Sequence, residues 1–293
     1  MAWQQVEFAL AAERTGLAEA TLEALGASAV TWSQAAGAQA VLEPAPGQTQ
    51  LWDQVNGSAL FADDVDTAAV EAALVEALGE RPGALHWQVL ADQPWERAWL
   101  AHFQPQAFGN RLWVVPHGHV APDSNAVNVW LDPGLAFGTG THPTTALCLQ
   151  ALAAEPPQGL KLIDYGCGSG LLGIAALRLG AASVVAVDND PQARHATLEN
   201  AERNGVADRL VVADPSTPLP VADWVIANIL AGVLCDLAPR LLAALADNAR
   251  LTLAGLLSDQ ADTVKAAYTP GVEFAPAVAK DEWLRLDAVR TAL

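Results

Sequence analysis

The chain contains little cysteine. Cys148, Cys167 and Cys235 are the three in 293 residues, and they form no Cys-x-x-Cys pair. An odd number of widely spaced thiols predicts a protein without disulfides. The histidines other than His142 also lack cysteine or carboxylate partners at metal-ligand spacing, so we expect no bound metal.

Long apolar runs are absent as well. The richest apolar stretch, Trp224 to Cys235, is bounded by Asp223 and Asp236 and is far shorter than the ~20 residues of a spanning helix. The first residues lack the basic start and the apolar middle of a secretory signal. These absences favour a cytoplasmic protein that does not contact a membrane.

Basic residues are scarce. The chain holds 15 Lys and Arg against 33 Asp and Glu, a net charge of -18 at pH 7. In residues 1–80, twelve acidic residues stand against Arg14 alone, a net charge of -11. Such a field disfavours RNA and DNA and speeds association with a basic protein. The simpler alternative is a solvated acidic surface that keeps the protein soluble.

The first 80 residues show strand and helix patterns in alternation. Val6 to Leu10 alternates like a strand, and Leu17 to Leu25 has apolar residues at helical spacing. A second helical stripe, Val70 to Leu78, has Asp66 as a candidate cap and Gly79 as its end. Short strand patterns lie at 29–32, 40–42, 59–61 and 86–90. The order predicts an α+β ferredoxin-like domain over residues 1–80, followed by a linker strand and helix over 81–105.

Residues 106–293 have the pattern of a parallel α/β sheet. Two strands are expected at 111–115 and 127–131. Five more, separated by helical stretches, are expected at 161–165, 183–187, 209–213, 223–228 and 249–254. The pattern predicts a doubly wound, Rossmann-like sheet.

A glycine turn follows the first of these five strands. The strand carries Asp164, and glycines then occupy alternate positions, Gly166, Gly168 and Gly170. Glycines allow the backbone to approach a ligand closely, and ligands of open α/β sheets bind at this end of the strands. The segment therefore indicates a nucleotide-cofactor site.

The next strand ends on Asp188, whose carboxylate can accept both hydroxyls of a ribose. A dinucleotide motif requires its third glycine three residues after the second, but Leu171 stands there. The spacing therefore favours S-adenosylmethionine over a nicotinamide dinucleotide. Asp190 and Pro191 are expected to cap and begin the following helix.

A loop rich in glycine and hydroxyl residues, 132–145, ends at a predicted helix start. Phe137 is an aromatic residue among polar ones, which suggests that the loop forms a lid over a pocket. We expect His142 to make an orienting hydrogen bond. The simpler interpretation is a connector whose helix is capped by Thr141 or Thr144.

An amide stands at the end of a central strand. Asn228 follows the apolar residues 224–227 and precedes Ile229. An uncharged carbonyl can accept from an amine and aim its lone pair without stabilising the unreactive protonated form. An Asn at such a position is more often a strand-end cap. The support for a functional role of Asn228 therefore comes from the neighbouring motifs. Cys167 is interpreted as a small turn residue without a catalytic role.

These segments resemble the methyltransferases of large-subunit ribosomal protein eleven. The resemblance rests on Asp132–Thr145, Ile163–Leu172, Val187–Asp188 and Asn228–Ala231, and it covers residues 90–285 more strongly than the acidic start. It implies a class I methyltransferase that transfers methyl groups from S-adenosylmethionine to lysine side-chain and N-terminal amines of that basic protein. It also implies that the ferredoxin-like domain binds the substrate.

The predicted mechanism is in-line displacement by a neutral amine held by Asn228 and the Ile229 carbonyl. Candidate contacts to the methyl donor, which leaves as S-adenosylhomocysteine, are Phe137, Gly138, Thr139, Thr141, His142, Thr145, Asp164, Gly166, Gly168, Gly170, Asp188 and Asn228. We expect a monomer that does not contact nucleic acid. Two alternatives are a nicotinamide oxidoreductase, disfavoured by Leu171 and by the lack of an evident hydride-site acid, and a noncatalytic adenosine-binding module that tethers a basic partner.

Overall fold

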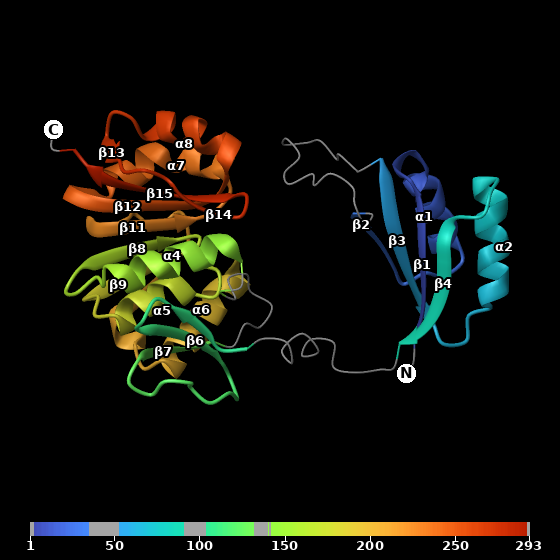
Figure 1. The fold of residues 1–293 in the computed structure, drawn as a ribbon, viewed down its shortest axis with the longest axis horizontal. Coiled ribbons are helices and arrows are strands. Elements are labelled where there is room, and N and C mark those ends of the chain that lie inside the picture. The colour runs from blue at the N-terminus through green and yellow to red at the C-terminus, as the bar shows by residue number, and fades with distance from the viewer. Residues whose placement is uncertain (1–2, 35–52, 91–103, 132–139, 141, 292–293) are drawn as a thin grey trace. The chain divides into compact units, whose positions relative to one another are not determined.

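The computed structural model describes residues 3–34, 53–90, 104–131, 140 and 142–291. The chain divides into two units, Met1–Ala98 and Trp99–Leu293 (Figure 1). Within the described ranges, no helix is long and apolar enough to cross a membrane.

The first unit is a four-stranded antiparallel sheet with two helices on one face. Its elements are β1 (Trp3–Ala11), η1 (Ala12–Arg14), α1 (Thr15–Ala24), β2 (Ala29–Gln34), β3 (Gln54–Ala62), α2 (Thr67–Leu78) and β4 (Gly83–Leu90). The strand order is β2-β3-β1-β4. Alternate residues of β1, Val6, Phe8 and Leu10, are buried against Leu22 of α1 and Leu74 of α2. This is the ferredoxin-like arrangement that the sequence predicts.

The ends of α2 follow the sequence prediction. The Asp66 carboxylate accepts hydrogen bonds from the N–H groups of Ala68 and Ala69, each at 3.1 Å. Gly79 ends the helix with a φ of 73°, a left-handed conformation that glycine adopts without steric cost.

The first unit extends beyond the predicted boundary at residue 80. β4 pairs with β1, with Trp87 opposite Val6, so the strand that was expected in a linker is part of the N-terminal sheet. The strand pattern at 86–90 was therefore predicted, but the domain boundary was placed before it. The strand expected at 40–42 and the helix expected at 94–102 lie outside the described residues.

The second unit begins with a small sheet and continues with a large one. The small sheet contains β5 (Gln106–Phe108), β6 (Leu112–Pro116) and β7 (Val127–Leu131). The large sheet and its helices comprise α4 (Pro143–Ala154), β8 (Lys161–Tyr165), α5 (Leu171–Arg178), β9 (Ser183–Val187), α6 (Pro191–Arg203), η3 (Ala207–Arg209), β10 (Leu210–Ala213), β11 (Ala222–Asn228), α7 (Ala231–Ala243), β12 (Leu245–Leu257), η4 (Ser258–Gln260), α8 (Ala261–Tyr268), β13 (Val272–Phe274), β14 (Val278–Lys280) and β15 (Trp283–Arg290).

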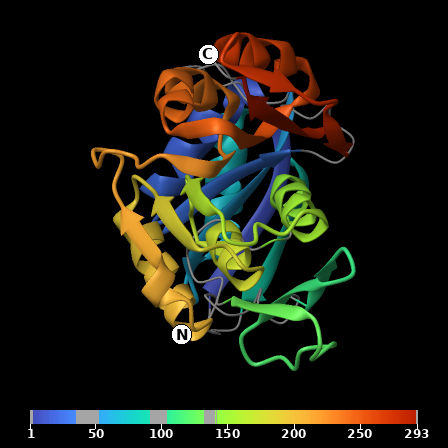
Figure 2. The same ribbon diagram turned by 90° about the vertical axis from the view of Figure 1, so that its left-hand side faces the viewer.

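Five neighbouring strands of the large sheet are parallel, in the order β10-β9-β8-β11-β12 (Figures 1 and 2). Side chains of β11 alternate between two cores: Trp224 and Ile226 pack on the side of α4 and α5, and Val225 and Ala227 pack on the side of α7 and α8. Helices therefore cover both faces, as the doubly wound prediction requires. The strand order reverses direction between β8 and β11, which is where open α/β sheets bind ligands.

Three antiparallel strands that the sequence analysis did not predict extend this sheet. β15 pairs with β12, and both β13 and β14 pair with β15. Buried and half-buried residues alternate along most of β15, from Trp283 onward, as in a strand with two covered faces.

Candidate functional site

The glycine turn lies at the carboxyl end of β8. Gly166, Gly168 and Gly170 have φ values of 77°, 53° and 79°, all in the left-handed region that disfavours side chains. Their spacing in the sequence thus follows from the shape of the turn. A helix, α5, begins at Leu171 directly after it.

Neighbouring strand β9 holds one side of the turn. The N–H groups of Gly166 and Cys167 both donate to the Val187 carbonyl, at 2.7 and 3.0 Å. The N–H of Gly168 donates to Oδ2 of Asp188 at 2.9 Å, and Oδ1 accepts from the Asp190 N–H at 3.0 Å. Each carboxylate oxygen keeps a further lone pair, so Asp188 can still accept from the hydroxyls of a ribose.

Two buried polar side chains of α6 hold the other carbonyls of the turn. The Thr197 hydroxyl donates to the Gly168 carbonyl at 2.9 Å, and the Asn200 amide donates to the Ser169 carbonyl at 2.9 Å. Both side chains are fully buried. Sequence reasoning missed them because a polar residue on a helix gives no local sign of burial.

Asp164 lies beneath the turn, buried in the sheet. Its Oδ2 accepts from the Gly173 N–H at 2.8 Å. Burial, opposed by this hydrogen bond and assisted by the charge of Asp188, raises the pKa of Asp164 to about 7. The carboxyl group therefore changes protonation near neutral pH, and a cation bound close to it would favour the ionised form.

Asn228 and Ile229 lie on the other side of the turn. β11 pairs with β8 so that Ala227 stands opposite Tyr165, which brings Ile229 next to Gly166. A Cβ added to Gly166 would lie 2.2 Å from Cγ2 of Ile229, so the two residues are in direct contact. The Asn228 amide nitrogen donates to Oγ1 of Thr145 on α4 at 3.2 Å.

His142 caps the start of α4. Its Nδ1 accepts from the Thr144 N–H at 3.3 Å and lies 2.7 Å from the Thr144 hydroxyl. The N-cap is therefore His142 and not Thr144, which lies inside the helix, while Thr141 lies outside the described residues. Partial burial lowers the pKa of His142, and the nearby Glu282 opposes this, so the neutral ring keeps the lone pair that the cap requires. The Trp283 ring meets the His142 ring edge-on at 4.8 Å.

Comparison with known proteins decides which kind of nucleotide-binding fold this is. The family model for "Ribosomal protein L11 methyltransferase (PrmA)" matches residues 2–291. The chain belongs to this family. A relative of that name from Ectopseudomonas mendocina is 45% identical over 292 residues, 99% of this chain and 100% of the relative. One from Methylococcus capsulatus is 48% identical over 294 residues, 98% and 99% of the two chains.

A solved structure of the family agrees. The crystal structure of ribosomal protein L11 methylase from Lactobacillus delbrueckii subsp. bulgaricus is 30% identical, with a TM-score of 0.58, and covers 65% of this chain and all of that chain. The chain is therefore a class I, S-adenosylmethionine-dependent methyltransferase. The nicotinamide oxidoreductase considered from the sequence is set aside.

The structure brings together a large part of the predicted site. Asp164, the three glycines and Asp188 surround the end of β8 on one side, and Asn228, Ile229 and Thr145 meet them on the other. Phe137, Gly138, Thr139 and Thr141 lie outside the described residues. Gly140, at the end of the same loop, is buried against Leu171, the first residue of α5.

The residues present fit S-adenosylmethionine. The turn has no side chains at its three glycines, the half-buried Asp188 keeps free acceptor capacity, and the buried Asp164 suits a cationic ligand. Cys167 is buried, and burial raises the pKa of its thiol, so it stays protonated and is a poor nucleophile. Among the described residues, no group of three or more His, Cys, Asp or Glu is arranged to hold a metal.

Gly255 on β12 lies against the candidate site, and the sequence analysis missed it. It has a φ of 87°, and a Cβ there would lie 2.4 Å from the Ile229 carbonyl oxygen. The β12–β15 register shifts at this glycine, between Ala254 and Leu256, as at a bulge. An isolated glycine in an apolar strand was the available signal, since it often marks a close approach of another backbone.

The buried Asp164 predicts a pH-dependent stability. Its pKa is about 7 in the folded protein against an ordinary 3.8. The unfolded chain therefore loses this proton first, and the free energy of unfolding falls as the pH rises from about 4 to about 7, by at most ~1.4 kcal/mol per pH unit.

Asp164→Asn isolates this effect, because the amide is neutral at every pH and can still accept from Gly173. Denaturant titrations at several pH values should show the variant gaining stability relative to wild type between about pH 4 and 7, and no further gain above that. A difference that does not change with pH would refute the assignment.

Proposed function

We propose that this enzyme transfers methyl groups from S-adenosylmethionine to lysine side-chain and N-terminal amines of ribosomal protein L11. The names of the curated relatives support the choice of substrate. The observation that best supports the mechanism is the contact between Gly166 and Ile229. This contact places the glycine turn, which suits the methyl donor, beside the Asn228–Ile229 segment, which suits the acceptor amine.

The residues around the end of β8 bind the methyl donor. When bound, S-adenosylmethionine supplies a methyl carbon activated by a sulfonium centre. Asp188 accepts from the ribose hydroxyls, the glycine turn allows close backbone approach, and Asp164 provides negative charge toward the cationic donor. Asp188 also bonds Gly168, so one carboxylate both shapes the turn and binds the ribose.

Asn228 and Ile229 hold the acceptor amine. Thr145 accepts from the Asn228 amide nitrogen, which fixes the orientation of the amide and leaves its carbonyl oxygen for the N–H of an incoming amine. A second acceptor is the Ile229 carbonyl, whose position Gly255 secures. Because Asn228 has no charge, it directs the nitrogen lone pair at the methyl carbon without favouring the unreactive ammonium form. Positioning supplies the rate enhancement.

Transfer of labelled methyl groups to purified ribosomal protein L11, followed by mass spectrometry of the modified amines, tests this function. Donor binding without any transfer would support the noncatalytic adenosine-binding module instead.

Asn228→Ala and Asp188→Ala should have separable effects. Asn228→Ala removes the amine acceptor and should lower kcat roughly tenfold to a hundredfold while the donor Kd changes little. Asp188→Ala removes the ribose acceptor and should raise the donor Kd by at least about tenfold. Single-turnover transfer and calorimetry measure the two quantities. A wild-type kcat for Asn228→Ala at saturating donor would exclude the proposed role.

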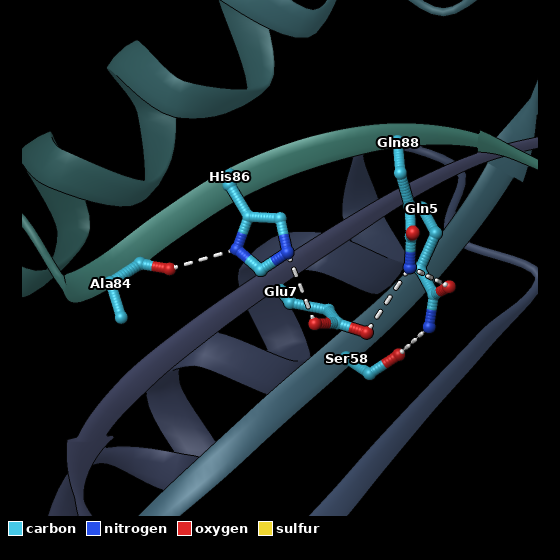
Figure 3. Close-up of polar contacts among 6 residues, drawn as sticks. All are labelled: Gln5, Glu7, Ser58, Ala84, His86 and Gln88. Atoms are coloured by element: carbon cyan, nitrogen blue, oxygen red, sulfur yellow. Dashed lines mark hydrogen bonds and ion pairs between the residues drawn. The ribbon is translucent and has the colours of Figure 1, made fainter.

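We infer that the acidic N-terminal unit attracts the basic substrate through its helical side. On the other side, the open sheet face carries Gln5, Glu7, Ser58, His86 and Gln88, which bond one another (Figure 3). The Glu7 carboxylate lies 3.2 Å from Nε2 of His86 and accepts a hydrogen bond from Nε2 of Gln88 at 3.2 Å. Most other described acidic residues of this unit lie on α1, α2 or their flanking turns: Glu13, Glu19, Glu23, Asp63, Asp64, Asp66, Glu71, Glu76 and Glu80.

Charge removal on this helical side should slow association. The triple variant Glu13→Gln, Glu23→Gln, Glu76→Gln changes three exposed side chains, and Glu202→Gln, Asp247→Asn, Asp262→Asn is a matched control on the second unit. We expect the first variant to lower the association rate and its salt dependence more than the control, because screening limits the field to ~8 Å at physiological ionic strength. Equal association rates for the two variants in stopped-flow binding would contradict the proposal and would indicate that these charges serve solubility only.

We also propose that the enzyme is a monomer that acts in the cytoplasm on the protein substrate without contacting nucleic acid. The net charge of -18 supports the last point, since it repels phosphate backbones.

A further inference from the structure

Asn228 ends a row of three residues that runs across the sheet. Asn228 on β11 stands opposite Ala254 on β12, and Ala254 stands opposite Arg285 on β15. Residues in register on neighbouring strands point to the same face. Leu284 and Leu286 pack on the opposite side, with α7 and α8, so Arg285 faces α4 as Asn228 does. Ala254, between them, is fully buried.

Helix α4 is bonded to both ends of this row. Thr145 accepts from Asn228 at 3.2 Å, and two residues later the Leu147 carbonyl accepts from Nη1 of Arg285 at 2.5 Å. The two contacts fix the first turns of α4 against the sheet from two directions. A shift of the helix at Leu147 would therefore move the Thr145 hydroxyl away from the Asn228 amide.

A chain of buried and partly buried hydrogen bonds holds Arg285 in place. Its Nε donates to Oδ2 of Asp287 at 2.8 Å, and Oδ1 of Asp287 accepts from the Thr252 hydroxyl at 2.9 Å. The Trp224 indole N–H donates in turn to Thr252 at 3.0 Å. The Arg285 side chain is 11% exposed, so its charge depends on these partners. A planar guanidinium held by a carboxylate has one defined direction in which to reach the helix.

We propose that Arg285 is a positioning residue for methyl transfer. It holds α4 through the Leu147 carbonyl, α4 holds Thr145 on the Asn228 amide, and the Asn228 carbonyl oxygen stays directed at the amine. The proposal rests on the proposed function, and it adds that the antiparallel extension of the sheet carries a residue on which the rate of transfer depends.

A second arginine provides a matched control. Arg250 on β12 pairs with Glu155, which directly follows α4, with Nη1 and Oε2 2.8 Å apart. Its guanidinium lies 5.1 Å from the centre of the Trp224 ring. Arg250 thus contacts the far end of the same helix, and its side chain is 42% exposed. Removing it takes away an ion pair and a ring contact but leaves the indole N–H of Trp224 donating to Thr252, and leaves Thr145 and Asn228 untouched.

Kinetics of three variants test the proposal in the full chain. Arg285→Met removes the donors but keeps the length of the stem, and it should lower kcat by at least about tenfold with the donor Kd within about twofold of wild type. Arg285→Lys should recover part of the loss, and Arg250→Met should leave both quantities within about twofold. The concentration of active enzyme is set by single-turnover amplitude, so partial unfolding does not count as a lower kcat.

A double-mutant cycle distinguishes positioning from general stabilisation. If Arg285 acts through Thr145, Arg285→Met combined with Thr145→Ala should be no slower than the slower single variant. Multiplicative losses, or an Arg285→Met enzyme with wild-type kcat, would overturn the proposal. If Arg285→Met does not fold, the cycle with Arg285→Lys decides by the same criterion. Methyl transfer by wild-type enzyme in the same assay keeps this test separate from that of the proposed function.

Discussion

The packing of Ile229 between two glycines is the constraint on which the site depends. A Cβ on Gly166 would lie 2.2 Å from the Ile229 side chain, and one on Gly255 would lie 2.4 Å from its carbonyl oxygen. A side chain at Gly166 would displace the Ile229 side chain, and one at Gly255 would displace the backbone of the segment that carries Asn228. The Ile229 N–H also donates to the Ala254 carbonyl at 3.1 Å, next to Gly255. The missing side chains therefore allow the glycine turn and the Asn228–Ile229 segment to lie in contact.

Topology places this contact at the switch point of the parallel sheet, where open α/β sheets bind ligands. The chain leaves β8 toward β9 on one side and returns to β11 on the other, so Asp188 and Asn228 flank the same turn. Burial raises the pKa of Asp164 to about 7, and it raises the pKa of the Cys167 thiol so that the thiol stays protonated. In the proposed mechanism, neutral hydrogen-bond acceptors serve the amine and carboxylates serve the donor. This division of roles suits a reaction between a neutral nucleophile and a cationic methyl donor.

Local signals predicted the parts of the structure that depend on a few neighbouring residues. The Asp66 cap, the Gly79 end, the glycine turn after β8 and the Asp190 cap of α6 are of this kind. Features that depend on long-range register were not predicted. The pairing of β4 with β1, the strands β13 to β15, the approach of Gly255 to Ile229 and the reach of Arg285 to α4 all join residues far apart in the chain. A sequence pattern shows that a residue is apolar or charged, but not which strand lies beside it.

The kinetics of Gly255→Ala test the central constraint most directly. The added Cβ must push the Ile229 backbone away, so kcat should fall by at least about tenfold while S-adenosylmethionine binds with nearly unchanged affinity. Gly232→Ala is the matched control, because nothing lies within 4 Å of the Cβ it would add, at the start of α7. It should transfer methyl groups at the wild-type rate. A folded Gly255→Ala enzyme as fast as the Gly232→Ala enzyme would contradict the account.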